Sequence, residues 1–466
     1  MSDPVQIAAD EIRQCLDDAS LRDWVAEQRW YASKSRAVTG IEIVEGISLT
    51  DQLFLALVQT RFATGTHELY QLPLTLRPAD TTPSPEHRIA DTSDWAVYDA
   101  LAAPAELVEL VARMEADSEI DAAEGNFAFH RVEGMPAIGR DAVVRPVGVE
   151  QSNSSLIIDD EIVLKVFRKL EPGINPELEM LRFLTTHGFS NIASLYGWYE
   201  YDGQALAATL GVAQRFLPNA EDGWALALRE IADEPESFLR RLGSLGEVTA
   251  RMHNCLASDA GDPAFAPEEP SNEALSLLTA TVDEDIERIF IRLPDDDERL
   301  APIVGRGQDV RERLAARAQA GAGGRAIRTH GDYHLGQTLY TPHGWVVIDF
   351  EGEPARALPE RRQKRSPLRD VAGMLRSFAY VVSAAEIQSG RAPAADFEIG
   401  ARDAFLDQYF AHIDTALLPA GEAAIVNLLT IFELEKAIYE LGYELDNRPD
   451  WVPIPVAGIR RLLEVG

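Results

Sequence analysis

The chain has 466 residues with 46% hydrophobic and 8% aromatic content, and its formal net charge at pH 7 is −33. The composition is typical of a globular protein, the length predicts two or three domains, and the acidity argues against a broad nucleic-acid-binding surface, which needs basic patches. No apolar run reaches the roughly 18–20 residues of a membrane span. With no signal peptide evident, and with Cys15 and Cys255 in no metal-binding spacing, we expect a cytoplasmic protein with no membrane partner.

The first part of the chain predicts one helix followed by strands. Residues 1–38 are typical of a helix and a compact turn. From Gly40 the pattern changes to strands, which Gly-Thr and Pro breaks separate: IEIVEGISL, LFLALVQTRF and ELYQLPLTLR. The stretch Trp95–Met114 is rich in Ala, Leu and Glu, and it predicts a helix.

The middle of the chain predicts further strands and then a change to helices. Residues 176–188 place apolar side chains at helical spacing and stop at Gly188. After Pro218 the pattern is mostly helical, with polar interruptions at Ser258–Asn272 and, as a basic run, at Arg356–Arg369. The additional antiparallel strands are predicted over residues 127–134, 142–170 and 205–218.

The most informative motif is H-G-D-Y-H-L-G-Q at residues 330–337, followed by I-D-F-E-G-E-P at 348–354. It places Asp332 five residues before Gln337, and Asp349 directly after an apolar strand. ATP-dependent phosphoryl transfer needs such a set, namely a base for the acceptor hydroxyl and two oxygen ligands for Mg²⁺. The spacing matches the protein-kinase catalytic loop, and the D-F-G aspartate corresponds to Asp349. We therefore predict a phosphotransferase with Asp332 as base and Mg²⁺ on Gln337 and Asp349.

Such an enzyme also needs a strand lysine for the ATP phosphates and a helix glutamate that holds it. Lys165 lies in the apolar strand IVLKVF, and Glu177 opens the next helix. Glu179 points to a different face of that helix and is the weaker candidate. A strand-rich N-terminal half with the nucleotide lysine, joined to a helical C-terminal half with the catalytic carboxylates, predicts an α+β, bilobal protein-kinase-like fold.

A polar turn takes the place of the glycine-rich loop that covers ATP in protein kinases. It contains Ser152, Asn153 and Ser154. Hydroxyls, amides and backbone N–H groups in such a turn can hold phosphates, although a plain polar hairpin explains the residues equally well. The segment QRFLP, with Gln214 and Phe216, lies where the two lobes should join. Its backbone could bind adenine, with Phe216 packing on the ring.

Several segments carry a family likeness: E-Q-S-N-S-S at 150–155, L-K-V-F-R-K-L at 164–170, the run from His330 to Phe378, and R-W-Y at 29–31. They resemble the bacterial maltokinases, within the aminoglycoside-phosphotransferase-like superfamily. The resemblance implies that the ATP γ-phosphoryl group is transferred to the anomeric hydroxyl of maltose, giving maltose 1-phosphate for α-glucan and glycogen synthesis. It also implies three parts, namely a cap subdomain over 1–100, a nucleotide-binding N-lobe over 101–217 and a helical C-lobe over 218–466.

The segment FELEKAIYE, residues 432–440, predicts a helix with two faces. One face could be a solvated surface with ion pairs between neighbouring turns. Because the acceptor site of the family lies in this region, the resemblance favours Glu435, Lys436, Tyr439 and Glu440 as sugar contacts, with His334 and Trp451 as additions. The opposite face is an apolar stripe that should pack on the core: Leu428, Ile431, Leu434, Ile438, Leu441 and Leu445.

The catalytic motif does not name the sugar, so other functions stay open. One alternative is a glucosamine 6-kinase or another sugar or aminoglycoside kinase, and a second is a non-catalytic kinase-like scaffold. Because the family is often coupled to trehalose synthase, that enzyme is a possible non-covalent partner. The basic run after the magnesium motif is either a solvated loop, an attractor for ATP or the partner of an acidic patch. Asp370 is expected to brace the catalytic-loop backbone.

Overall fold

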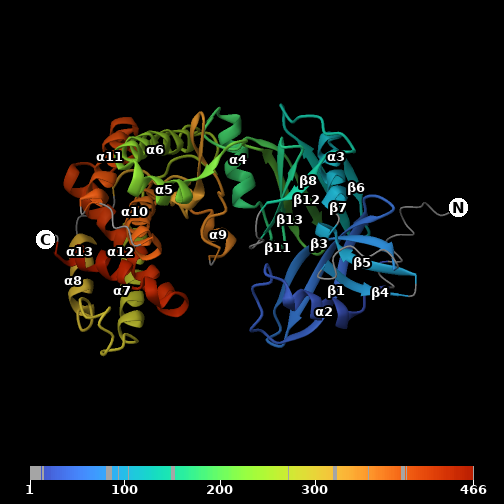
Figure 1. The fold of residues 1–466 in the computed structure, drawn as a ribbon, viewed down its shortest axis with the longest axis horizontal. Helices are drawn as coiled ribbons and strands as arrows, with labels where there is room; N and C mark the ends of the chain where they lie inside the picture. The colour runs from blue at the N-terminus through green and yellow to red at the C-terminus, as the bar shows by residue number, and fades with distance from the viewer. Residues whose placement is uncertain are drawn as a thin grey trace. The chain divides into compact units, whose positions relative to one another are not determined.

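The structure of the protein is a computed structural model (Figure 1), which divides the chain into two compact units. The first unit comprises residues 1–182 and 193–218, and the second comprises 183–192 and 219–466. Within the described residues, no helix is both long enough and apolar enough to cross a bilayer. The residues that the structure describes are 12, 15–79, 87–92, 94–102, 104–147, 153–270, 272–318, 323–354, 356–389, 394 and 396–464.

The first unit begins with helix α2 (Asp18–Glu27), which packs on an antiparallel six-stranded sheet. The sheet has the order β1-β2-β3-β5-β4, and β11 pairs with β3. Alternating apolar residues make β1, β2 and β3 pack on one core with the helix, and the three strands predicted here from the sequence are confirmed. The strands are β1 (Val38–Ser48), β2 (Leu53–Phe62), β3 (His67–Pro78), β4 (Arg88–Asp91), β5 (Trp95–Asp99) and β11 (Lys169–Leu170).

The helix predicted over Trp95–Met114 is wrong in its first half. Residues Trp95–Asp99 form strand β5, which pairs with β3 and β4. Aromatic and β-branched side chains such as Tyr98 and Val97 favour a strand once a sheet edge is available to pair with them. The helix α3 occupies only Val108–Glu115.

The second sheet of the first unit has seven antiparallel strands in the order β6-β7-β12-β13-β10-β9-β8. Strand β12 (Leu195–Gly203) was not predicted, although alternate residues of LYGWYEYDG are buried as they are in a one-sided strand. Helix α4 (Pro176–Thr186) follows β11. The other strands are β6 (Glu119–Asp121), β7 (Gly125–Arg131), β8 (Val144–Pro146), β9 (Asn153–Ile158), β10 (Ile162–Phe167) and β13 (Ala207–Arg215).

Buried polar contacts join the two sheets of the first unit. The side-chain amide of Gln71 on β3 donates to the carbonyls of Phe167 at 3.0 Å and Leu210 at 2.7 Å. Arg168, between β10 and β11, is fully buried, and its Nη2 lies 2.7 Å from Oδ2 of Asp99 on β5. The same guanidinium donates to the Ser154 hydroxyl at 2.8 Å. The sheets therefore share a buried charge as well as apolar contacts.

The second unit is mostly helical, as predicted, and contains one small sheet with the order β14-β15-β16. Helices α6 and α11 pack so closely that a Cβ on Gly246 would lie 2.1 Å from the Phe405 carbonyl oxygen. Helices α7, α8, α12 and α13 enclose a separate apolar core, and the predicted stripe along α12 faces it. The longer helices are α5 (Gly223–Asp233), α6 (Pro235–Leu256), α7 (Asn272–Phe290), α8 (Gly307–Ala318), α10 (Leu368–Ser389), α11 (Phe397–His412), α12 (Glu422–Asn447) and α13 (Pro453–Glu464). The shorter elements are β14 (Glu221–Asp222), β15 (Thr338–Thr341), β16 (Gly344–Val347) and α9 (Leu358–Arg361).

Candidate active site

The catalytic-loop motif forms a tight turn that a buried carboxylate holds. Gly331 has φ +87°, a left-handed conformation that glycine adopts without steric cost. Asp370, in the first turn of α10, accepts from the backbone N–H groups of His330 at 2.7 Å and Gly331 at 3.0 Å. Burial opposes its ionisation, but hydrogen bonds and charge from His253 and the backbone donors hold the pKa of Asp370 below its ordinary value. Asp370 therefore makes the contacts with the catalytic-loop backbone that its expected bracing role requires.

The loop is also fixed by the imidazole of His330. Its Nε2 lies 2.9 Å from the Ile348 carbonyl oxygen, and its ring packs against Tyr333 and Phe350. The hydroxyl of Tyr333 in turn lies 2.8 Å from that of Thr249 on α6. Both halves of the sequence motif are thus tied together, which is the positional control that a catalytic side chain requires.

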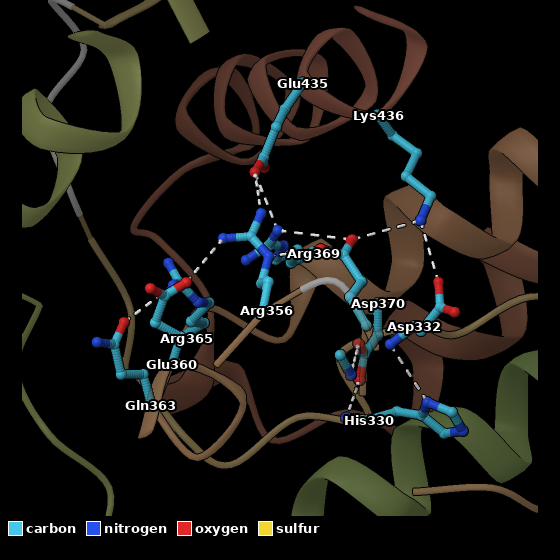
Figure 2. A network of polar contacts seen from close by, with 12 residues as sticks. His330, Asp332, Arg356, Glu360, Gln363, Arg365, Arg369, Asp370, Glu435 and Lys436 are labelled. Carbon is cyan, nitrogen blue, oxygen red and sulfur yellow. Dashed lines mark hydrogen bonds and ion pairs between the residues drawn. The ribbon is translucent and has the colours of Figure 1, made fainter. Parts of the chain in front are cut away.

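Asp332, the predicted base, faces a cation from helix α12. Lys436 Nζ lies 3.1 Å from Asp332 Oδ1 and 3.5 Å from Glu353 Oε1, so one ammonium contacts two carboxylates (Figure 2). Burial disfavours the ammonium, but Asp332 and Glu353 outweigh it and raise the pKa of Lys436. Burial likewise opposes ionisation of Glu353, yet Lys436 and Arg369 hold the pKa of that carboxyl below its usual range. Asp332 is therefore placed beside a permanent positive charge.

The residues predicted to hold Mg²⁺ lie at neighbouring points of the small sheet. The backbone N–H of Ile348 donates to the Gln337 carbonyl at 3.0 Å, which places Gln337 beside the end of β16 where Asp349 follows. Asp349 has φ +64°, a conformation that is uncommon for a residue with a Cβ and is concentrated at functional sites. An oxygen of Glu351 lies within 4.8 Å of one from Asp349. Amide and carboxylate oxygens are the donors that a hard cation prefers, so the set fits Mg²⁺.

The predicted nucleotide residues come together in the first unit. Lys165 Nζ on β10 lies 2.6 Å from Glu177 Oε2 on α4, as the sequence spacing predicts. The other oxygen of Glu177 accepts from the Gln214 side-chain amide at 3.0 Å. Glu177 is almost fully buried, so these two donors stabilise a carboxylate that would otherwise be costly to bury. The lysine is thus held by a carboxylate that is itself fixed.

The polar turn predicted to cover the phosphates is described only in part. Ser152 lies outside the described residues, and Asn153 opens strand β9. Ser154 is buried, and its hydroxyl accepts from Arg168, as noted above. The backbone N–H of Phe216 donates to the Glu161 carbonyl at 2.8 Å, and its ring lies under the guanidinium of Arg145. The roles given to these residues in ATP binding stay predictions.

A cavity of about 470 Å³ opens beside Asp332 in the second unit, a size that suits a small-molecule ligand. Five of the predicted sugar contacts line it, namely His334, Lys436, Tyr439, Glu440 and Trp451. The structure does not place Glu435 there: its carboxylate lies 2.9 Å from Arg369 and 3.5 Å from Arg356 on another side of α12. Burial lowers the pKa of His334, although nearby Asp332 opposes the effect, so this imidazole should be neutral near pH 7.

Besides the predicted Tyr439 and Trp451, the cavity contains aromatic residues that the sequence interpretation missed, namely Trp224, Tyr380 and Tyr443. Tyr380 and Trp451 have ring centroids 6.2 Å apart and nearly parallel planes, and Arg448 lies over Trp451 at 4.7 Å. Trp224 and Tyr443 complete the aromatic lining. The repeat of Tyr at positions 439 and 443, one helical turn apart, was the available signal for Tyr443. Trp224 and Tyr380 come from distant segments and carry no such signal.

One interpretation of the sequence made the polar face of helix α12 a solvated surface, but the acidic side chains Glu433 and Glu440 on this face are buried. Glu433 is buried and bonds Arg402 at 2.7 Å, and Glu440 is buried and bonds Arg376 at 2.6 Å. These two ion pairs join α12 to the neighbouring helices α11 and α10. Helix α12 is therefore fixed by charge on the side that carries Lys436.

Comparisons with known proteins agree with this architecture. Residues 24–102 match the maltokinase N-terminal cap domain, and residues 143–353 match the phosphotransferase enzyme family. A glucosamine kinase from Mycolicibacterium smegmatis is 28% identical over 357 residues, which cover 73% of this chain and 84% of that protein. A glucosamine kinase from Streptacidiphilus jiangxiensis is 28% identical over 333 residues, covering 68% and 73%.

The fold predicted from the sequence is confirmed by a solved structure. A glucosamine kinase in complex with glucosamine, ADP and inorganic phosphate superposes with a TM-score of 0.70 at 21% sequence identity, covering 95% of this chain and 98% of the other. The strand-rich first unit and the helical second unit are those of an α+β, kinase-like fold. The chain thus combines a segment similar to the maltokinase N-terminal cap domain with a following segment similar to the phosphotransferase enzyme family.

Proposed function

We propose that the protein transfers the γ-phosphoryl group of ATP to a hydroxyl of a sugar, with maltose as the acceptor and maltose 1-phosphate as the product. In the first unit, Lys165 would bind the ATP phosphates while Glu177 fixes its ammonium group. In the second unit, Asp332 would accept a hydrogen bond from the attacking hydroxyl and take its proton as attack develops. The braced loop and the Lys436 ion pair would hold that carboxylate in place.

Gln337 and Asp349 are the proposed magnesium ligands, with Glu351 close enough to hydrogen-bond water in the ion's hydration shell. The argument rests on their all-oxygen donor set and on the backbone hydrogen bond that joins their segments. Mg²⁺ bound there would supply positive charge against the phosphate oxygens.

The charge balance of the cavity beside Asp332 supports a neutral acceptor, and this observation carries the choice of substrate. Each carboxylate that lines the cavity already has a cationic partner in the protein. An amino sugar would bring an ammonium group whose natural partner is a carboxylate, whereas neutral hydroxyls can accept from and donate to groups that are already paired. The pairs are Asp332 with Lys436, Glu353 with Arg356, Glu440 with Arg376 and Glu444 with Arg448.

The aromatic lining supports an acceptor with more than one sugar ring. The faces of sugar rings are apolar and pack on aromatic side chains, while their hydroxyls need polar groups at the edge. The Tyr380–Trp451 pair offers one such face, and Tyr439 and Tyr443 on α12 offer a second. Maltose, a neutral disaccharide, has two rings to place against them, and the cap match at residues 24–102 agrees with this choice.

Glucosamine is the second candidate, because the curated relatives are glucosamine kinases that cover most of this chain. It would place phosphate on the 6-hydroxyl. A non-catalytic scaffold is disfavoured, because the chain retains Lys165, Asp332, Gln337 and Asp349 together. Association with trehalose synthase stays a prediction from the family likeness.

The test supplies the purified protein with ATP, Mg²⁺ and one acceptor at a time: maltose, glucose, glucosamine or an aminoglycoside. Phosphorus NMR of the product identifies the phosphorylated oxygen. We expect a maltose product with phosphate on O1, and we expect Asp332→Asn to lower kcat by at least about 100-fold while ATP still binds. Turnover of glucosamine but not maltose would replace the acceptor, and no turnover with any sugar would remove the proposed function.

A further inference from the structure

A second cavity, of about 520 Å³, lies in the same unit and adjoins the first. The two share Asp332, Glu353, Lys436 and Tyr439 in their linings, so they meet on either side of the Lys436 ion pairs. The second cavity extends toward the basic run that follows the magnesium motif. In the proposed function the acceptor occupies only the first cavity, and the basic run Arg356–Arg369 has no role.

Most of the charge in the second cavity is internally balanced. A chain of alternating charges leads from Asp332 through Lys436, Glu353 and Arg369 to Glu435, and its contacts are drawn in Figure 2. Glu435 accepts from Arg369 at 2.9 Å and lies 3.5 Å from Arg356, while Glu353 contacts Arg356 at 2.5 Å. These acidic side chains therefore offer little attraction for a further cation.

The other charged residues of the lining also have partners or are hydrated. The Asp370 carboxylate accepts from backbone N–H groups, Asp285 bonds Arg288, and Lys364 lies 2.6 Å from Glu268. Glu360 keeps 51% of its side chain exposed and approaches Arg356 only to 4.0 Å. Any positive charge in the cavity that no carboxylate neutralises therefore belongs to one of the remaining cations.

Arg365 is that surplus cation. Among the residues that the structure describes, its guanidinium is in contact with no carboxylate, and it donates to the neutral amide oxygen of Gln363 at 2.9 Å. Its backbone is held in place by hydrogen bonds with Ile327 at 2.8 and 2.9 Å, so the side chain starts from a fixed point. Burial, together with the positive charges of Arg369 and Arg356, lowers the pKa of Arg365 to about 10.

The N–H donors of the Arg365 guanidinium are arranged in a way that suits a phosphate group. A guanidinium has five N–H donors in a planar fork, and arginine is favoured wherever a phosphate is bound. Within the described part of the chain, the ion pairs of Arg369 are made through Nη2, so a phosphate near Arg365 could share the remaining N–H groups. The cavity is also lined by Leu277, Leu278 and Val282 of α7, apolar side chains that suit the less polar part of a phosphate ester.

We propose that the second cavity is a binding site for phosphomonoesters, in which Arg365 is the principal cation and Arg369 and Arg356 assist. A dianionic phosphate would offset the positive charge that Arg365 shares with these two arginines. Asp332 also lines the second cavity, so the proposed site is the part of this cavity at Arg365, and a phosphate bound there would be a different group from the transferring phosphate. The site is independent of whether maltose or another sugar is the acceptor.

The test is direct binding by isothermal titration calorimetry, which needs no turnover. Nucleotide-free protein at low ionic strength is titrated with inorganic phosphate, maltose 1-phosphate, glucosamine 6-phosphate and, as the uncharged comparison, maltose. We expect Arg365→Gln to weaken the binding of the phosphate compounds at least about 10-fold while leaving maltose unaffected. Arg365→Lys, which keeps the charge, should retain part of the affinity. Comparison of the three phosphate titrations distinguishes free phosphate from a sugar phosphate as the preferred occupant.

Two control variants make the outcome decisive. Arg460→Gln removes the same charge from the exposed face of α13 and should leave binding unchanged. Lys165→Met removes the proposed ATP contact in the first unit. Phosphate binding that is lost in Lys165→Met and kept in Arg365→Gln would overturn the proposal, because the phosphate would then occupy the nucleotide residues. Equal loss in Arg460→Gln and Arg365→Gln would also overturn it by showing an effect of net charge alone. Circular dichroism and thermal unfolding check that each variant is folded.

Discussion

The two contacts of Lys436 lead to a quantitative prediction. Its ammonium lies 3.1 Å from Asp332 Oδ1 and 3.5 Å from Glu353 Oε1. At these distances the attraction of a unit charge pair is about 5 kcal/mol at an effective dielectric constant of about 20, before desolvation is subtracted. Because Lys436 keeps 24% of its side chain exposed, screening and desolvation should reduce each net coupling to about 1–2 kcal/mol.

The assay is a pair of double-mutant cycles. Lys436→Met is combined with Asp332→Asn in one cycle and with Glu353→Gln in the other, and the free energy of unfolding is measured by urea denaturation. Lys364→Met with Glu268→Gln is a matched control cycle, since that pair is shorter, at 2.6 Å, but 62% of Glu268 is exposed. We expect the control coupling to stay below about 0.5 kcal/mol.

The pattern of couplings decides the outcome. Similar couplings in both Lys436 cycles would mean that a single cation holds the carboxylates of Asp332 and Glu353 together. A Lys436 coupling to Asp332 no larger than the control value would refute the reasoning, because the ammonium would then be oriented by Glu353 alone. In that case the charge beside the proposed base would have to come from another group.

Three further predictions concern other parts of the chain. Asp370→Asn should lower the free energy of unfolding by about 2–4 kcal/mol at pH 7, because two backbone donors lose a buried charged acceptor. Since the pKa of Asp370 is held below its ordinary 3.8, this contribution is present above about pH 4 and is lost as the pH falls further, so urea titrations at pH 7 and pH 3 should show the difference shrinking. Gly246→Ala should destabilise by at least about 2 kcal/mol, since its Cβ would lie 2.1 Å from a backbone oxygen, whereas Gly243→Ala, with nearest neighbours at 3.4 Å, should change the thermal midpoint little. Glu177→Gln should weaken the binding of a non-hydrolysable ATP analogue by about 10-fold or more in calorimetry and leave maltose affinity unchanged.

Features set by nearby residues could be predicted from the sequence. Asp332 and Gln337 lie five residues apart within one loop, so the sequence could place them together. Lys165 and Glu177 lie twelve residues apart, on a strand and the helix that follows it, so their contact could be predicted as well. The strands of the cap region alternate clearly enough to be placed. Strand β5 was missed because it runs directly into an alanine-rich helix, and only its pairing with β3 makes it a strand.

Contacts between distant segments could not be predicted in the same way. Glu435 was expected at the sugar, and nothing in its helix shows that two arginines 66 and 79 positions earlier neutralise it. Trp224 and Tyr380 likewise reach the cavity beside Asp332 from separate helices. Periodicity identifies which face of a helix a residue occupies, but the neighbour of that face depends on how the helices pack.

The buried guanidinium of Arg168 has a consequence for modularity. One of its carboxylate contacts, Asp99, belongs to the cap region, whereas Arg168 itself follows the strand that carries Lys165. Deleting the cap would remove the Asp99 carboxylate from this buried guanidinium, and loss of one partner of a buried ion pair commonly costs several kcal/mol. Expression of residues 101–466 alone should therefore yield poorly folded protein unless position 168 is changed as well. Loss of the cap in evolution would therefore favour a substitution at that arginine.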